Sequence, residues 1–111
     1  MNVIAFSAES ASPISEFGSR GARAQALADG DGESHVYFFH LEAGGVIGPH
    51  PAGFHQLFLV TFGSGWVAGA DGLRQVLSAG QGAVITRGEI HSKGSDGGLS
   101  AIMIQIERSR T

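Results

Sequence analysis

The chain has 111 residues, enough for one domain with one hydrophobic core. Its net charge of −3 and its scattered Lys and Arg residues argue against the clustered basic surface that nucleic-acid binding usually needs. The sequence has no cysteine, which excludes disulfides, thiolate metal sites and thiol catalysis. No apolar run approaches the roughly 20 residues of a membrane span. We therefore expect a single cytoplasmic domain without nucleic-acid or membrane partners.

The first thirty residues are the least regular part of the sequence. Residues 3–6 predict a short strand, and residues 7–21 are typical of loops. Residues 22–28 are ambiguous, because alanines favour a helix whereas the segment is short and bounded by glycines. We favour a strand, because the DGDG sequence at 29–32 predicts a hairpin turn with residues 36–39 as the partner strand.

The rest of the chain predicts short strands separated by glycine turns. Residues 56–62 are apolar at both alternating sets of positions, so this strand must be covered on both faces. No segment after residue 30 shows helical periodicity, and so many short strands indicate a sandwich or a small barrel. The predicted strands are 34–42, 56–62, 65–70, 73–78, 83–86, 90–94 and 99–107, the last with three isoleucines on one face.

Two glycine-bounded blocks each contain a histidine. The first block begins at Gly44 and reaches His50 after five residues, followed by Ala52 and Gln56, and it ends at a glycine at position 63. The second begins at a glycine at position 80 and contains a second glycine at 88, three residues before His91. Function depends on whether these two histidines meet in the folded chain, and around what.

These two blocks resemble the two sequence motifs of the cupins. The spacing matches in both motifs, although Ala52 and Gln56 stand where the first motif has its second histidine and its glutamate. The resemblance implies an all-β fold, the double-stranded β-helix or jelly-roll barrel. It implies one cupin domain over residues 1–111, with residues 34–107 as the barrel core and residues 1–30 as an N-terminal extension with edge strands.

In cupins, the residues at these positions converge on one divalent metal ion inside the barrel. The resemblance therefore implies His50, Gln56 and His91 as ligands of a divalent transition metal, while Ala52 cannot ligate. Imidazole-rich sites suit Zn, Cu, Ni or Fe rather than Mg or Ca. The candidate metals are Zn, Fe, Ni or Mn. The alternative is a site without metal, in which the two histidines are simply buried and hydrogen-bonded.

His55 is an alternative ligand. On a regular strand, His55 and its neighbour Gln56 point to opposite faces, so an inward Gln56 leaves His55 outside. A bulge at Gly53 would instead turn His55 inward and complete a three-histidine site. Both placements stay open at this stage.

The candidate pocket walls are His40, Phe38, Phe58 and Val60. An apolar pocket with few polar groups is typical of small-molecule sites. We expect a cupin that binds a small molecule in its barrel beside a degraded, weak metal site. The alternative is a metal-dependent enzyme of the dioxygenase or isomerase type, with His50 and His91 holding the metal.

The strand at residues 56–62 also provides evidence about the oligomeric state. Its outward set, Leu57, Leu59 and Thr61, needs a cover, which is either an N-terminal strand or a second subunit. Cupins are commonly dimers, and symmetric pairs are the usual form of homo-oligomer. We therefore expect a homodimer.

Overall fold

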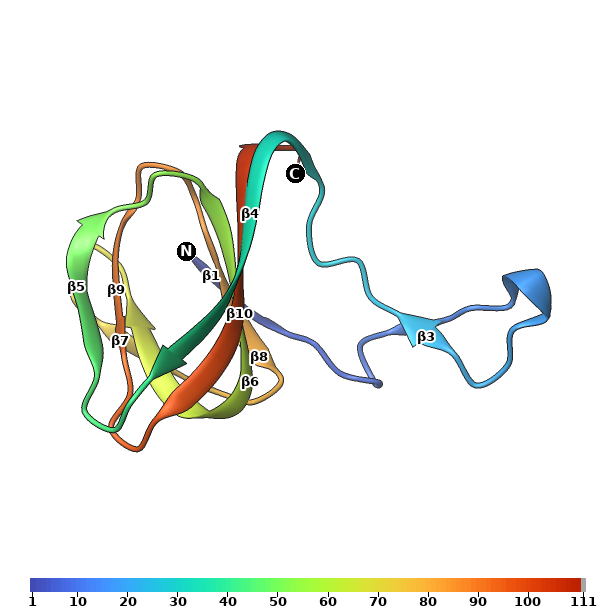
Figure 1. Ribbon diagram of the computed structural model, residues 1–111, viewed down its shortest axis with the longest axis horizontal. Coiled ribbons are helices and arrows are strands. Elements are labelled where there is room, and N and C mark those ends of the chain that lie inside the picture. The colour runs from blue at the N-terminus through green and yellow to red at the C-terminus, as the bar shows by residue number, and fades with distance from the viewer. Residues whose placement is uncertain (111) are drawn as a thin grey trace.

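The computed structural model describes residues 1–110 and consists mainly of strands, which confirms the all-β class (Figure 1). No helix in this part of the chain is long and apolar enough to cross a membrane. The elements are β1 (Asn2–Ala5), β2 (Ser12–Pro13), the 3-10 turn η1 (Glu16–Gly18), β3 (Arg23–Ala24), β4 (Gly30–Leu41), β5 (Val46–Pro51), β6 (His55–Ala68), β7 (Arg74–Ser78), β8 (Gln81–Ile85), β9 (Ile90–Gly94) and β10 (Leu99–Ser109).

The strands form a barrel with two walls. One wall has the order β1-β8-β6-β10-β4, and all neighbours in it are antiparallel. The other wall contains β5, β9 and β7, with β9 hydrogen-bonded to both β5 and the second half of β6. Strand β6 therefore belongs to both walls and joins them.

The continuity of β6 corrects the sequence prediction, which placed two strands there with a turn at the glycines of positions 63 and 65. The chain bends at Gly63, where φ is 77°, but it remains in a strand through Ala68. A Cβ atom at Gly63 would collide with the carbonyl oxygen of Gly98. The glycine thus permits a bend with close backbone contact rather than a reversal of the chain.

The core lies between the two walls. Phe58 and Val60 of β6 point inward and are fully buried. They pack in one cluster with inward side chains of the neighbouring strands, namely Leu77, Ala83, Ile85, Leu99 and Ala101. This alternation confines one face of β6 to the interior.

The other face of β6 is also apolar, as the sequence predicted. Leu57 and Leu59 point outward yet are only 3% and 8% exposed. The segment before β4 contributes Leu27 to a cavity of about 530 Å³ that Leu57 also lines. Farther along the same outer face, Phe38 and Phe62 are more than 70% exposed, so the cover is incomplete.

The N-terminal extension forms an arm between β1 and β4 that projects away from the barrel (Figure 1). Strand β3 pairs with β2, not with β4 as the sequence predicted. Phe17, near the tip of the arm, is 99% exposed and has a left-handed backbone with φ 61°. Beyond its two ends, where Phe6 and Asp29 have main-chain hydrogen bonds to Gly80 and Arg110, the arm pairs with itself through β2 and β3.

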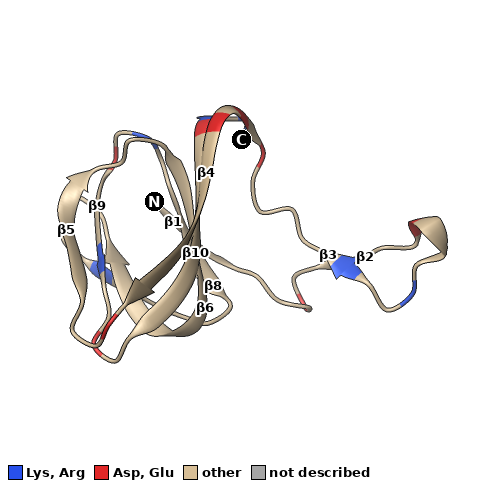
Figure 2. Ribbon diagram, viewed as in Figure 1, with Lys and Arg blue, Asp and Glu red and all other residues tan. Residues whose placement is uncertain are grey.

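The predicted turn at residues 29–32 is also wrong, because Gly30 and Asp31 pair with β10 and begin β4. The Asp31 carboxylate accepts a hydrogen bond of 2.5 Å from Arg108, and Asp29 lies 2.9 Å from Arg110. Figure 2 shows these opposite charges at the shared end of β4 and β10. Long-range ion pairs and strand pairing thus replace the local hairpin.

We expect Gly63→Ala to lower the free energy of unfolding by about 1–3 kcal/mol, because alanine is strained at positive φ and its Cβ would meet the Gly98 carbonyl. Urea denaturation measures this change. Gly69→Ala is the matched control, since no atom lies within 4 Å of its Cβ position. Equal stability of both variants would contradict this account of the bend.

Candidate functional site

The two histidines that the sequence blocks singled out meet in the structure. His50 of β5 and His91 of β9 are direct cross-strand partners. Their ring centroids are 4.4 Å apart, and the ring planes are inclined by 52°. The register between these two strands therefore brings two imidazoles together from positions far apart in the chain.

His50 is held in one tautomer by its own strand. Its Nδ1 lies 2.8 Å from the carbonyl oxygen of Gly48, and a carbonyl only accepts, so Nδ1–H is the donor. In the neutral ring, this leaves the Nε2 lone pair available. A backbone carbonyl that fixes the tautomer in this way is the usual support of a metal-ligating histidine.

His91 is the buried member of the pair, with only 1% of its surface exposed. Neither of its ring nitrogens has a hydrogen-bond partner among the described residues. Burial, followed by the nearby charges of Lys93 and His50, lowers the pKa of His91 to about 4, against an opposite effect of Glu89. The ring is therefore neutral near pH 7, which is the form that binds metals and accepts hydrogen bonds.

Gln56 supplies a third unpartnered polar atom. It shares the inward parity of Phe58 on β6, is 5% exposed, and its buried Oε1 has no hydrogen-bond partner within residues 1–110. Gln56 also borders the cavity that His55 and Leu57 line. No group of three His, Cys, Asp or Glu side chains in the described chain is placed to hold a metal ion. Two imidazoles would thus need the amide oxygen or external ligands to complete a coordination shell.

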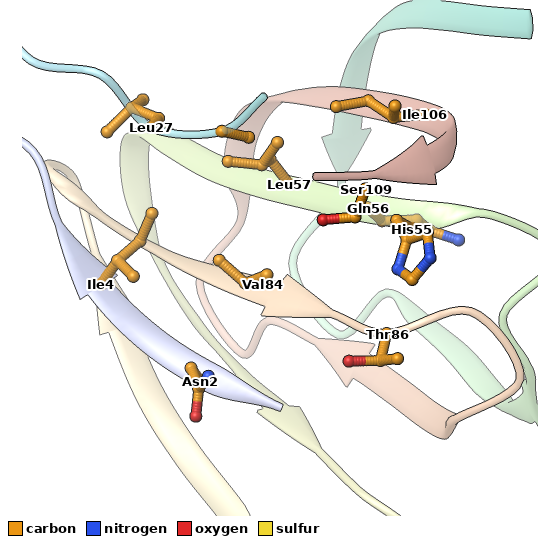
Figure 3. Close-up of a pocket in the computed structure, with 11 residues that line it drawn as sticks. Asn2, Ile4, Leu27, His55, Gln56, Leu57, Val84, Thr86, Ile106 and Ser109 are labelled. Carbon is orange, nitrogen blue, oxygen red and sulfur yellow. The ribbon is translucent and has the colours of Figure 1, made fainter. Parts of the chain in front are cut away.

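The structure places His55 elsewhere. It lies on the outer face of β6, where its Nδ1 accepts a 3.3 Å hydrogen bond from the backbone N–H of Arg87. Figure 3 shows it beside Thr86 in the cavity that Leu57 and Val84 also line. The bulge that would have turned it toward His50 does not form, because regular alternation continues from position 55.

Two of the four expected pocket residues are also outside. Phe38 is 71% exposed, and His40 is exposed with its Nδ1 3.0 Å from the Ser100 hydroxyl. The alternate side chains of β4 point to the interior. There Phe39 contacts Phe58 edge to face, with ring centroids 5.2 Å apart. Phe58 and Val60 lie in the interior, as expected.

Glu89, two residues before His91, is already paired. The N-terminal ammonium of Met1 lies 2.8 Å from one of its carboxylate oxygens and 3.0 Å from the other. The Met1 side chain packs against the core cluster. The carboxylate nearest to the two histidines in sequence is therefore engaged by another cation.

A residue that the sequence reasoning missed is Lys93, the only lysine in the chain. It lies two positions after His91 on the same face of β9 and is 2% exposed. Its Nζ is 4.7 Å from the Phe58 ring centre and 5.6 Å from that of Phe39. Burial lowers the pKa of Lys93 to about 8. The alternation from His91 was the signal that could have located it inside.

The lowered pKa of Lys93 predicts a pH-dependent stability. Between pH 8 and 10.5 the unfolded chain binds more protons at this site, so the free energy of unfolding rises with pH. Below pH 8 both states are protonated, and the burial penalty of about 3 kcal/mol is fully present. We expect Lys93→Met to be more stable than wild type at neutral pH by up to this amount.

Urea denaturation from pH 7 to 10.5 measures the effect. The stability gap between Lys93→Met and wild type should shrink as pH rises through this range. Arg74→Met is the control, because this cation is exposed and lies over the Trp66 ring. A gap that stays constant with pH would contradict the assignment.

The fold was compared with those of known proteins. No protein-family model and no curated protein matches the chain. A cupin superfamily protein from Desulfitobacterium hafniense aligns over 96% of this chain and 99% of its own, with TM-score 0.63 and 14% identity. A cupin-like protein from Thermotoga maritima aligns over 67% and 57%, with TM-score 0.63 and 24% identity. A cupin-2 domain protein from Shewanella frigidimarina aligns over 67% and 71%, with TM-score 0.58 and 20% identity. The expected cupin fold is thereby confirmed: the chain is a small cupin barrel.

Proposed function

We propose that this barrel binds a small molecule at the His50–His91 pair and that the pair holds a divalent transition metal weakly. The observation that carries the proposal is His91, which is buried and whose two ring nitrogens have no hydrogen-bond partner within residues 1–110. A buried polar group without a partner is destabilising, so its retention points to a partner from outside the chain. A metal ion, or a polar group of a ligand, would satisfy it.

The donors present suit a weak site. His50 offers Nε2, His91 offers a neutral ring, and Gln56 offers an amide oxygen, so the set contains no negative charge. Imidazole donors suit Zn, Fe, Ni or Mn. When bound, such an ion would act as a Lewis acid that orients and polarises a ligand oxygen. The protein residues would fix the ion's position between the buried His91 and the exposed His50.

Metal content and affinity test this function. We expect untagged wild-type protein to bind Zn²⁺ or Ni²⁺ in calorimetric titration and the His50→Ala/His91→Ala double variant to lose at least about tenfold in affinity. His40→Ala is the matched control, because His40 lies on the outer face. Equal metal binding by the wild type and the double variant would overturn the site.

Gln56 gives a second, independent measurement at the same site. Gln56→Glu introduces the negative charge that the donor set lacks. We expect it to tighten Zn²⁺ binding by at least about tenfold, because a carboxylate stabilises a divalent cation better than an amide does. Unchanged affinity in this variant would remove Gln56 from the ligand set while leaving the histidine pair in place.

We also propose that two copies pair through the outer face of the wall that contains β4, β10 and β6. Val36, Phe38 and Phe62 are 68%, 71% and 72% exposed on this face. The register sets Phe38 opposite Ile102, which in turn lies opposite the outward Leu59. A contiguous apolar face of this kind is unusual on a monomer and can pair with its own copy about a two-fold axis.

The assembly is tested by light scattering at micromolar concentration. We expect wild type to have the mass of a dimer and Phe38→Glu to shift it toward monomer, because a charge at the interface is desolvated without a partner. Val76→Glu, at an equally exposed apolar position on β7, should leave the mass unchanged. A monomeric wild type would refute the proposed pairing.

A further inference from the structure

The single lysine of the chain is a buried cation without a counter-ion. Lys93 is 2% exposed, and its ammonium has no hydrogen bond or ion pair to the described residues, only the faces of two phenyl rings. Lysine is almost never fully buried unless it is paired. We therefore expect the ammonium of Lys93 to pair with an anion from outside the chain.

No carboxylate of the described residues forms an ion pair with Lys93, and none is among the buried residues of the barrel. Glu89 pairs with the Met1 ammonium, and Glu33 pairs with His35. Asp31 and Glu107 both pair with Arg108 at the far ends of β4 and β10. Within residues 1–110, the interior wall that carries Lys93 thus contains a positive charge and no negative one.

The side chains around the Lys93 ammonium indicate which kind of ligand could bind there. Phe39 and Phe58 line one side of Lys93 and contact each other edge to face. His91 lies two residues away on the same face of β9, which places its ring about 7 Å along the strand. The barrel interior therefore has a cation next to an apolar aromatic surface, with a neutral imidazole further along β9.

We propose that Lys93 is the anion-binding residue of the barrel and pairs with the carboxylate of a small, partly apolar organic acid. The apolar body of the acid contacts Phe39 and Phe58, and a polar group at its other end reaches His91. The inference rests on the proposed function, that the barrel holds a small molecule beside the two histidines. It requires no metal, because the ammonium supplies the charge.

The uniqueness of Lys93 makes the test direct. Protein labelled with ¹³C,¹⁵N-lysine gives one lysine side-chain signal, which is then titrated with acetate, butyrate and benzoate in the presence of a chelator. The neutral amides of the same three acids are matched controls of nearly the same shape. We expect at least one acid to shift the signal saturably and its amide to leave it unchanged.

The variant that tests the residue is Lys93→Met, which keeps the stem and removes the charge. We expect it to bind the responsive acid at least about tenfold more weakly, because a charge-assisted hydrogen bond is lost. Arg74→Met, which removes a surface cation, should bind as wild type does. Equal affinity of Lys93→Met and wild type, or equal responses to acid and amide, would overturn the proposal.

Two further measurements distinguish a failure of the Lys93 proposal from a failure of the proposed metal site. If chloride or phosphate shifts the lysine signal as strongly as every carboxylate, the site takes a simple inorganic anion and the assigned ligand class is wrong. The second arm uses the His50→Ala/His91→Ala double variant. Carboxylate binding retained there, with metal binding lost, supports Lys93 as a separate anchor. Metal binding by wild type without any carboxylate response would refute this inference and leave the proposed function standing.

Discussion

The two pairings of β9 determine what the barrel interior contains. One edge of β9 is hydrogen-bonded to β5 and the other to β6, so its register is set from both sides. Side chains on a strand alternate between faces, and a slip of one residue would exchange the two sets. The observed register puts His91 and Lys93 inside and places His50 directly opposite His91. The chemistry of the interior is therefore a consequence of strand pairing.

The charge of the barrel interior differs from the charge that the cupin sequence motif implies. The resemblance to cupins implies a histidine at position 52 and a glutamate at position 56, where this chain has Ala52 and Gln56. Both changes remove ligands, and the second also removes a negative charge. Lys93 adds a positive one, so the balance of the described interior is cationic. A site of this sign is less suited to holding a cation firmly and better suited to receiving an anion.

The fold and the meeting of the two histidines could be predicted because the spacing of the two blocks resembles the two cupin motifs. The spacing places His50 on β5 and His91 on β9, and the pairing of these two strands brings the rings together. The face that β4 turns inward could not be predicted in this way. Val36 and Phe38 on one side and Tyr37 and Phe39 on the other are all apolar, so periodicity favours neither face.

Other misses have different physical causes. The N-terminal hairpin was wrong because Asp29 and Asp31 have partners almost eighty residues away in Arg110 and Arg108, and no local pattern reports such contacts. Lys93 was overlooked because a lysine is normally an exposed residue. Its burial follows only when the strand parity that carries His91 inward is extended by two residues.

The projecting arm has a topological consequence for how the barrel is closed. Strand β1 is hydrogen-bonded to β8 at the edge of one wall, but its only covalent link to the next barrel strand, β4, runs through the arm. Arg20 and Arg23 lie exposed in that arm. A trypsin cut there would divide the molecule into a short N-terminal peptide and a larger fragment without breaking a barrel strand. After such a cut, β1 would have no covalent link to the barrel, and its contacts would include the hydrogen bonds to β8 and the ion pair between Met1 and Glu89.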